Sequence, residues 1–131
     1  MKIASNIAGV ILGLLFLLAS GGFFYLVISK TPPPANFAPG SPADLFMKAV
    51  FPTGFMLFVK CFELIGAVLV MIPKTRNFGL LVLGPIIINI LAFHLFLDNP
   101  RALLDPMIIL IVVLAAFLLW SGRKAFAGLR G

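Results

Sequence analysis

Lys60 and Glu63 are the two side chains whose types and spacing could do chemistry in this chain. They stand near the middle of the apolar stretch 51–72, which is long enough to cross a bilayer. A charged group at bilayer depth costs at least ~2.5 kcal/mol, so it needs a partner or a function. The i,i+3 spacing puts both groups on one face of a helix, close enough to pair. We therefore expect this face to point toward other helices or a wet cavity.

Two interpretations of the pair are open. It can be an internal ion pair that fixes helix packing. It can also be a functional site that holds a ligand, a proton or a partner, because ionisable residues inside a membrane are functional candidates by default.

Other polar side chains fall at related depths in the predicted spans. At the helical rise, Ser20 and Asn89 lie ~12 Å below the outer ends of their helices, close to the ~13 Å and ~18 Å of the charged pair. Two more polar residues are shallower, at ~4–5 Å. The sequence thus predicts a polar layer with two side chains above it: Ser20, Lys60, Glu63 and Asn89 in the layer, and Tyr25 and His94 above.

Asn89 is expected to cap the Lys60–Glu63 pair. His94 is expected to be a hydrogen-bonded structural residue, and the alternative is an axial ligand of a tetrapyrrole metal. The chain holds one histidine, so a two-histidine haem is excluded. Cys61 points about 100° away from Lys60 around the helix and is expected to be a small core residue.

The elements that must position these residues are helices. With 131 residues, 62% of them hydrophobic and 11% charged, the chain has room for one domain and about four spans of ~20 residues. We predict an all-α, integral membrane four-helix bundle, one domain over 1–131, with spans at about 3–29, 51–72, 78–97 and 101–121. The first apolar run is too long for the core of a signal peptide, so it is expected to span.

The connections carry clear local signals. Residues 30–42 form a proline-rich outer loop, and Ser41, Pro42 and Asp44 then read as the start of a short interfacial helix over 42–50. Pro52 is expected to bend the chain into the second span. Asp105 reads as the N-cap of the fourth span. The 15 residues from Pro106 to Trp120 are few for a span, so we expect this helix either to start nearer Arg101 or to sit slightly outside the membrane core.

Smaller sequence signals complete the helices. A Gly84–Pro85 step predicts a kink in the third span. Gly9, Gly13 and Ser20 share one face of the first span, which favours close packing within the chain over dimerisation. Tyr25 and Trp120 are expected to be interface anchors.

The basic residues predict an orientation. Three cations stand on the predicted outer side, Lys30, Lys48 and Arg101, beside Asp44, Asp98 and Asp105. Six stand at the termini and the second-to-third turn, which predicts that both termini are cytoplasmic: Lys2, Lys74, Arg76, Arg123, Lys124 and Arg130. This placement at helix ends also argues against nucleic-acid binding despite the net charge of +6.

The absence of familiar motifs narrows the function. The sequence has no GxSxG, P-loop or HExxH motif, one cysteine and one histidine. A hydrolase, an ATPase or a metalloenzyme acting alone is therefore not expected, and neither is a metal site or an intrinsic cofactor.

Two pieces of the chain form recognisable motifs, F-x-K-x-x-E-L-x-G over 58–66 and N-I-L-A-F-H-L-F-L-D over 89–98. With these motifs the chain resembles the DoxX-like family of small bacterial membrane proteins. The resemblance implies a four-helix bundle in the bacterial cytoplasmic (inner) membrane, with Lys60 and Glu63 facing inward. It also implies a redox link, because relatives occur as small subunits of a thiosulfate:quinone oxidoreductase or beside thiol-detoxifying enzymes. It supports Lys60, Glu63 and His94 as positions to test; the proline-rich loop departs from the family pattern and could be a docking surface.

Two functions follow from these observations. The favoured one is a non-catalytic accessory subunit of a larger membrane redox or energy-converting complex, with membrane lipids and other subunits as partners. Such a subunit could share a quinone or a tetrapyrrole with its partner and would belong to an oxidoreductase only as part of the complex. The alternative is a self-contained binder or carrier of a small lipophilic, quinone-like molecule at the Lys60/Glu63 layer.

Overall fold

The computed structural model describes residues 2–30 and 37–130, and the regular elements over these residues are all helical. Part of the predicted outer loop, residues 31–36, lies outside the described residues. Six α-helices are present in the described part: α1 Lys2–Ile28, α2 Pro42–Val50, α3 Phe55–Met71, α4 Arg76–Ala92, α5 Pro106–Ser121 and α6 Arg123–Ala127. A π-helix, η1, continues α4 over Phe93–Leu97, and two 3-10 helices follow at η2 Pro100–Leu104 and η3 Gly128–Arg130.

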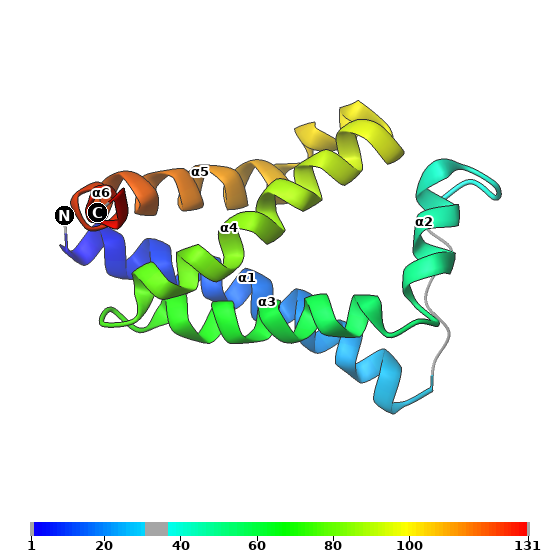
Figure 1. Cartoon of the computed structure of the whole chain (residues 1–131), viewed down its shortest axis with the longest axis horizontal. Coiled ribbons are helices and arrows are strands. Elements are labelled where there is room, and N and C mark those ends of the chain that lie inside the picture. The colour runs from blue at the N-terminus through cyan, green and yellow to red at the C-terminus, as the bar shows by residue number, and fades with distance from the viewer. Residues whose placement is uncertain (1, 31–36, 131) are drawn as a thin grey trace.

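The long helices run antiparallel in sequence order. Both chain ends and the turn between α3 and α4 lie at one end of the molecule, and α2 stands across the other end (Figure 1). From that turn α4 leans away from α3 toward the far end, while α5 returns to the end that holds the termini (Figure 1).

Small residues allow the first three long helices to pack closely. A methyl group built on Gly13 of α1 would meet Met71 and would lie 2.7 Å from the Ala67 carbonyl oxygen of α3. One built on Gly79 of α4 would lie 2.5 Å from the Val70 backbone nitrogen. The glycine stripe on α1 therefore serves packing within this chain, as the sequence predicts. The core around these contacts includes Leu12, Phe16, Val70, Leu83 and Leu118.

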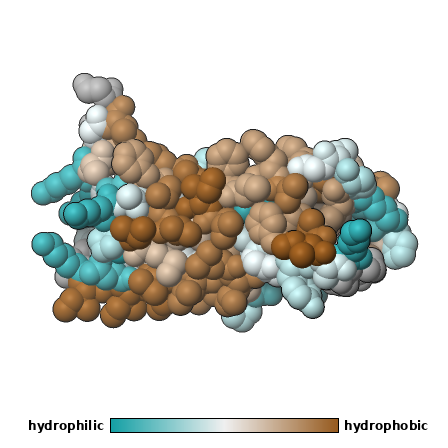
Figure 2. Space-filling model, turned by 90° about the horizontal axis from the view of Figure 1, so that it is seen from below, coloured by the Kyte–Doolittle hydropathy of each residue, from teal (hydrophilic) through white to brown (hydrophobic). Residues whose placement is uncertain are grey.

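Apolar length and exposure indicate a membrane protein. Two helical segments are long and apolar enough to span, α1 and the combined segment Arg76–Leu97, or up to three if α2 and α3, bent by 85°, form one broken span. The fourth candidate, α5, is a shorter apolar helix of 16 residues, ~24 Å long. Apolar side chains cover the middle of the face shown in Figure 2, and hydrophilic ones gather at its two ends. A soluble protein rarely exposes so wide an apolar band.

The predicted helix starts are partly confirmed. The Ser41 hydroxyl accepts the Asp44 N–H at 3.3 Å, with Pro42 at the first helical position, and the Asp105 carboxylate accepts the Met107 N–H at 2.8 Å. The chain also bends between α2 and α3, as predicted from Pro52.

Two predicted starts are wrong. The second span does not begin at Phe51: residues 51–54 form turns, Gly54 takes a left-handed φ of 81°, and the helix starts at Phe55. The fourth helix does not extend back to Arg101, because η2 occupies 100–104 and the Asp105 cap starts a separate helix. An N-cap residue has non-helical backbone angles, so the Asp105 cap fixes the start of α5 at Pro106 even though a longer helix would span a bilayer more fully. The alternative, a fourth helix that sits slightly outside the membrane core, stays a prediction.

Candidate functional site

Lys60 and Glu63 form the ion pair that their spacing predicts. The Lys60 Nζ lies 2.8 Å from Glu63 Oε2, and their side chains are 20% and 4% exposed. The contact lacks hydrogen-bond geometry, so the buried Oε2 has no hydrogen-bond partner in the described part of the chain. The carboxylate is therefore neutralised by a near charge, but one of its oxygens has no donor aimed at it.

Both charged groups belong to α3. An ion pair within one helix does not tie two helices together, unlike a bridge between neighbours. Lys60 is also partly accessible, although it lies in the middle of an apolar stretch. These two facts distinguish the pair from an ordinary packing contact.

Ser20 on α1 lies level with this pair. Gly13 packs against Ala67, and the helices are antiparallel, so seven residues further along α1 corresponds to about seven residues back along α3. Ser20 shares a helix face with Gly13 and Gly9, which both contact α3. Its side chain is fully buried, and its Oγ also lacks a hydrogen-bond partner among the described residues.

Buried polar atoms in proteins are almost always hydrogen-bonded to protein or ordered water. Here two such atoms, Ser20 Oγ and Glu63 Oε2, come from facing helices at one level. Within residues 2–30 and 37–130 Ser20 Oγ has no hydrogen-bond partner, and Glu63 Oε2 has the Lys60 ammonium at 2.8 Å but no aligned hydrogen bond. A bound water or a polar ligand atom is the usual explanation of such groups.

Asn89 reaches the predicted level but not the predicted role. The contact of Gly66 with Leu83 sets the α3–α4 register, and this register brings Asn89 level with Lys60. The buried face of α4 carries Leu83 and Ile87, and Asn89 follows Ile87 by roughly 200° of helical rotation, so its side chain is exposed. In the described part of the chain it does not cap the pair.

His94 occupies the unpredicted π-helix η1. Its Nδ1 lies 3.1 Å from Asp98 Oδ2, both side chains are about one-fifth exposed, and the Phe93 ring packs edge-on to the imidazole at 5.3 Å. The expected hydrogen-bonded structural role is consistent with this contact. Single π turns often occur at functional sites, and this one was not visible in the sequence.

The remaining predicted residues lie at the surface. Tyr25 is 69% exposed and Trp120 is 54% exposed, with the Arg123 guanidinium 4.3 Å above the indole. Tyr25 is therefore not part of a buried layer. The expectation that Cys61 is a core residue is wrong: it is exposed, because the face of α3 that packs on α1 and α4 carries Glu63, Gly66 and Val70.

Sequence reasoning missed an aromatic cluster at the α2 end of the molecule. The Phe93 ring contacts Phe46 of α2 at 5.4 Å and Phe37 at 5.6 Å, so α2 is tied to the end of α4. The single-sequence pattern shows that these phenylalanines exist but not that they meet.

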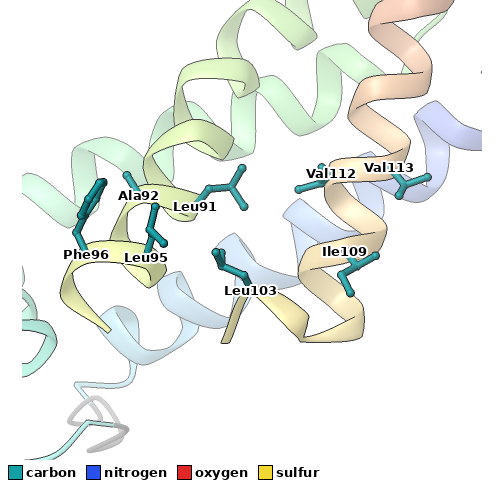
Figure 3. A pocket seen from close by; sticks show the side chains of 8 residues that line it. All are labelled: Leu91, Ala92, Leu95, Phe96, Leu103, Ile109, Val112 and Val113. Carbon is teal, nitrogen blue, oxygen red and sulfur yellow. The ribbon is translucent and has the colours of Figure 1, made fainter. Parts of the chain in front are cut away.

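Sequence reasoning also missed an apolar groove between α4 and α5. Eight apolar side chains, from Leu91 on α4 to Val113 on α5, line a space of about 450 Å³ (Figure 3). Leu103 of η2 lies between the two walls. No charged side chain lines this groove.

Comparison with known proteins gives one distant similarity. A Bacillus subtilis (strain 168) protein described as "Uncharacterized protein YwoB" is 32% identical over 73 residues, 56% of this chain and 46% of that protein. The chain thus spans about half the length of the curated relative it matches. No family model matches the chain. No solved structure matches it either. The description of that relative names no activity, so the similarity indicates none for this chain.

Proposed function

We propose that this chain is a membrane protein that binds a small lipophilic molecule at the Lys60–Glu63 pair. One observation carries the proposal: the Ser20 hydroxyl is buried without a hydrogen-bond partner in the described residues, and it lies level with a buried carboxylate whose oxygen Oε2 contacts a partly accessible ammonium without an aligned hydrogen bond. Unsatisfied buried atoms cost free energy unless something occupies them.

The side chains fit a ligand with carbonyl or weakly acidic oxygens, such as a quinone-like head group. The Lys60 ammonium offers three donors, the Ser20 hydroxyl one donor and acceptor capacity, and Glu63 can accept or supply a proton. A lipophilic tail suits the apolar surroundings of these helices. The chain itself would bind or carry the molecule, without catalysis.

A tetrapyrrole does not fit the described residues. His94 Nδ1 is engaged by Asp98 and the Phe93 ring packs on the imidazole. The apolar groove between α4 and α5 is lined by hydrocarbon side chains and does not include His94. We therefore do not extend the proposal to an axial role for this histidine.

We further propose a DoxX-like topology with four spans, α2 in the interface and both termini on the cytoplasmic side of a bacterial inner membrane. Support comes from the end that holds the termini and the α3–α4 turn, where basic side chains collect: Lys2, Lys74, Arg76, Arg123 and Lys124. Cation-rich ends face the cytoplasm in most membrane proteins.

A second candidate function is the accessory subunit of a larger redox or energy-converting complex. The α4–α5 groove favours it, because an apolar space of about 450 Å³ between two helices could receive a helix of a partner subunit. We rank it second because the groove lies apart from the charged pair and would leave the unpartnered atoms unexplained.

Mass spectrometry of small molecules that co-purify in mild detergent tests the proposal. The wild type is compared with Lys60→Met/Glu63→Leu, which removes the pair but keeps similar volumes. We expect a lipophilic molecule with the wild type and a loss of at least tenfold in the variant.

The matched control is Lys48→Met/Asp44→Asn, which removes the ion pair of α2, whose atoms are 3.0 Å apart and whose lysine is exposed. It should keep the bound molecule. If protein subunits co-purify with all three forms and no small molecule distinguishes them, the accessory-subunit function is correct and the binding site is not.

A further inference from the structure

Asn89 is an exposed amide in the middle of an apolar helix. An 18-residue window of the candidate span Arg76–Leu97 has a mean hydropathy of 2.4. Asn89 stands eight residues from the outer end of this span, ~12 Å along the helix. Its side chain is exposed, and within the described residues it makes no hydrogen bond. This places a fully polar group where lipid chains would surround it.

Such a placement is costly unless a partner is present. A primary amide has two N–H donors and a carbonyl acceptor, and the hydrocarbon core offers no water to satisfy them. Asparagine in spanning helices commonly hydrogen-bonds to a neighbouring helix. The charged pair on α3 does not serve, because the Asn89 side chain is exposed and makes no hydrogen bond within the described residues.

The surface around Asn89 is apolar and continuous along one side of α4. Phe78 and Pro85 precede it by 11 and four residues, spacings that return to the same side of a helix, and Phe78 is 66% exposed. Ile88 beside it is 68% exposed. A single polar residue within an apolar stripe is the pattern that fixes register in paired helices.

A second copy of this chain satisfies the amide by symmetry. Two copies inserted with the same orientation are related by a two-fold axis along the membrane normal, which brings identical residues to equal depth. The amide is self-complementary, so each Asn89 can donate to the carbonyl oxygen of the other. Symmetry places an amide at this depth in a second copy, whereas an unrelated partner would carry a polar group there only by coincidence.

We propose that the outward face of α4, centred on Asn89, is the interface of a symmetric dimer of this chain. The two Asn89 side chains hydrogen-bond to each other, and Phe78, Pro85 and Ile88 pack around them. This inference does not depend on the ligand site, because it uses exposed side chains of α4 and no atom of the Lys60–Glu63 pair.

Single-molecule photobleaching of labelled protein in lipid vesicles tests the proposal over a range of protein-to-lipid ratios. The wild type should dimerise. Asn89→Leu, which keeps the size and removes the amide, should weaken dimerisation by about tenfold, while Asn89→Gln should restore most of it. A wild type that is monomeric at every ratio, or an Asn89→Leu variant that associates like the wild type, would overturn the proposal.

Cysteine crosslinking provides a second measurement that does not rely on removal of the amide. In a Cys61→Ala background, Asn89→Cys should form a disulfide-linked dimer in membranes, whereas Ile65→Cys, on the exposed side of α3, should not. Absence of the first crosslink, or preference for the second, contradicts an α4 interface. Crosslinks from position 89 only to a different protein would mean a hetero-oligomer and would also overturn it.

Discussion

For Lys60 and Glu63, the free-energy cost of removing both charges from water opposes the attraction between them. Moving both charges out of water is costly, and a contact of 2.8 Å recovers much of that cost only when the remaining polar atoms are also satisfied. In this chain the ammonium contacts Glu63 Oε2 without an aligned hydrogen bond, and the Ser20 hydroxyl at the same level has no hydrogen-bond partner among the described residues. The pair is therefore expected to add little net stability, which favours a functional reason for its presence.

A double-mutant cycle measures this balance. Lys60→Met leaves a buried carboxylate without its counter-charge and should lower the free energy of unfolding by ~3 kcal/mol, whereas Lys60→Met/Glu63→Leu should stay within ~1 kcal/mol of the wild type. Unfolding in detergent micelles by denaturant provides the measurement. Equal loss in both variants would mean that the pair itself stabilises the fold.

Glycine contacts give a second residue-scale prediction. Gly13→Ala must displace the Ala67 carbonyl, 2.7 Å from the new methyl group, and should cost ~1–3 kcal/mol. Gly21→Ala on the same helix meets no atom within 4 Å and should be neutral or slightly stabilising. Thermal unfolding of the two variants side by side checks this; equal effects would contradict the α1–α3 packing.

The sequence predicted how deep each polar residue lies along its helix better than it predicted which way the side chain points. Rise per residue placed Ser20, Lys60 and Asn89 at one level, and the helix registers agree. Which way a side chain points depends on which neighbours cover the helix, and that information is not local. For this reason Asn89 and Cys61 were assigned to the wrong side of their helices.

Helix α2 shows which features of an element are local and which are not. Its N-cap and its first-turn proline could be predicted because they involve adjacent residues. Its packing on η1 through Phe93 could not, because the two segments are far apart in sequence. The start of α5 at Pro106 follows from the Asp105 cap, whereas no local sequence signal predicted the π-helix or the start of α3 at Phe55.

Removal of one ring tests the attachment of α2. Phe93→Ala deletes the contacts to Phe46 and Phe37 and should speed hydrogen exchange over residues 42–50 by about tenfold. Phe96→Ala, in the same π-helix but 75% exposed, should leave that exchange unchanged. If both variants behave alike, the aromatic cluster does not hold α2.

The whole molecule has its termini and its α3–α4 turn at one end, with α2 at the other (Figure 1). Combined with the basic residues at the first end, this arrangement predicts the membrane orientation. At either terminus, a fused reporter that is active only in the cytoplasm should give a signal, and a reporter that is active only outside the cytoplasm should give none. A reporter inserted after Gly40, in the exposed turn before α2, should show the opposite result. Two termini on different sides would contradict the four-span topology.

The central claim is that Glu63 takes part in binding a lipophilic molecule, and infrared spectroscopy of its carboxyl group tests this most directly. The Glu63→Gln variant assigns the band in protein stripped of lipophilic molecules by detergent washing. Addition of the organic extract of wild-type membranes should shift that band, because an oxygen that lacks a donor gains one. An unchanged Glu63 band, with the extract shown to enter the micelles, would contradict the claim and leave the pair without a ligand.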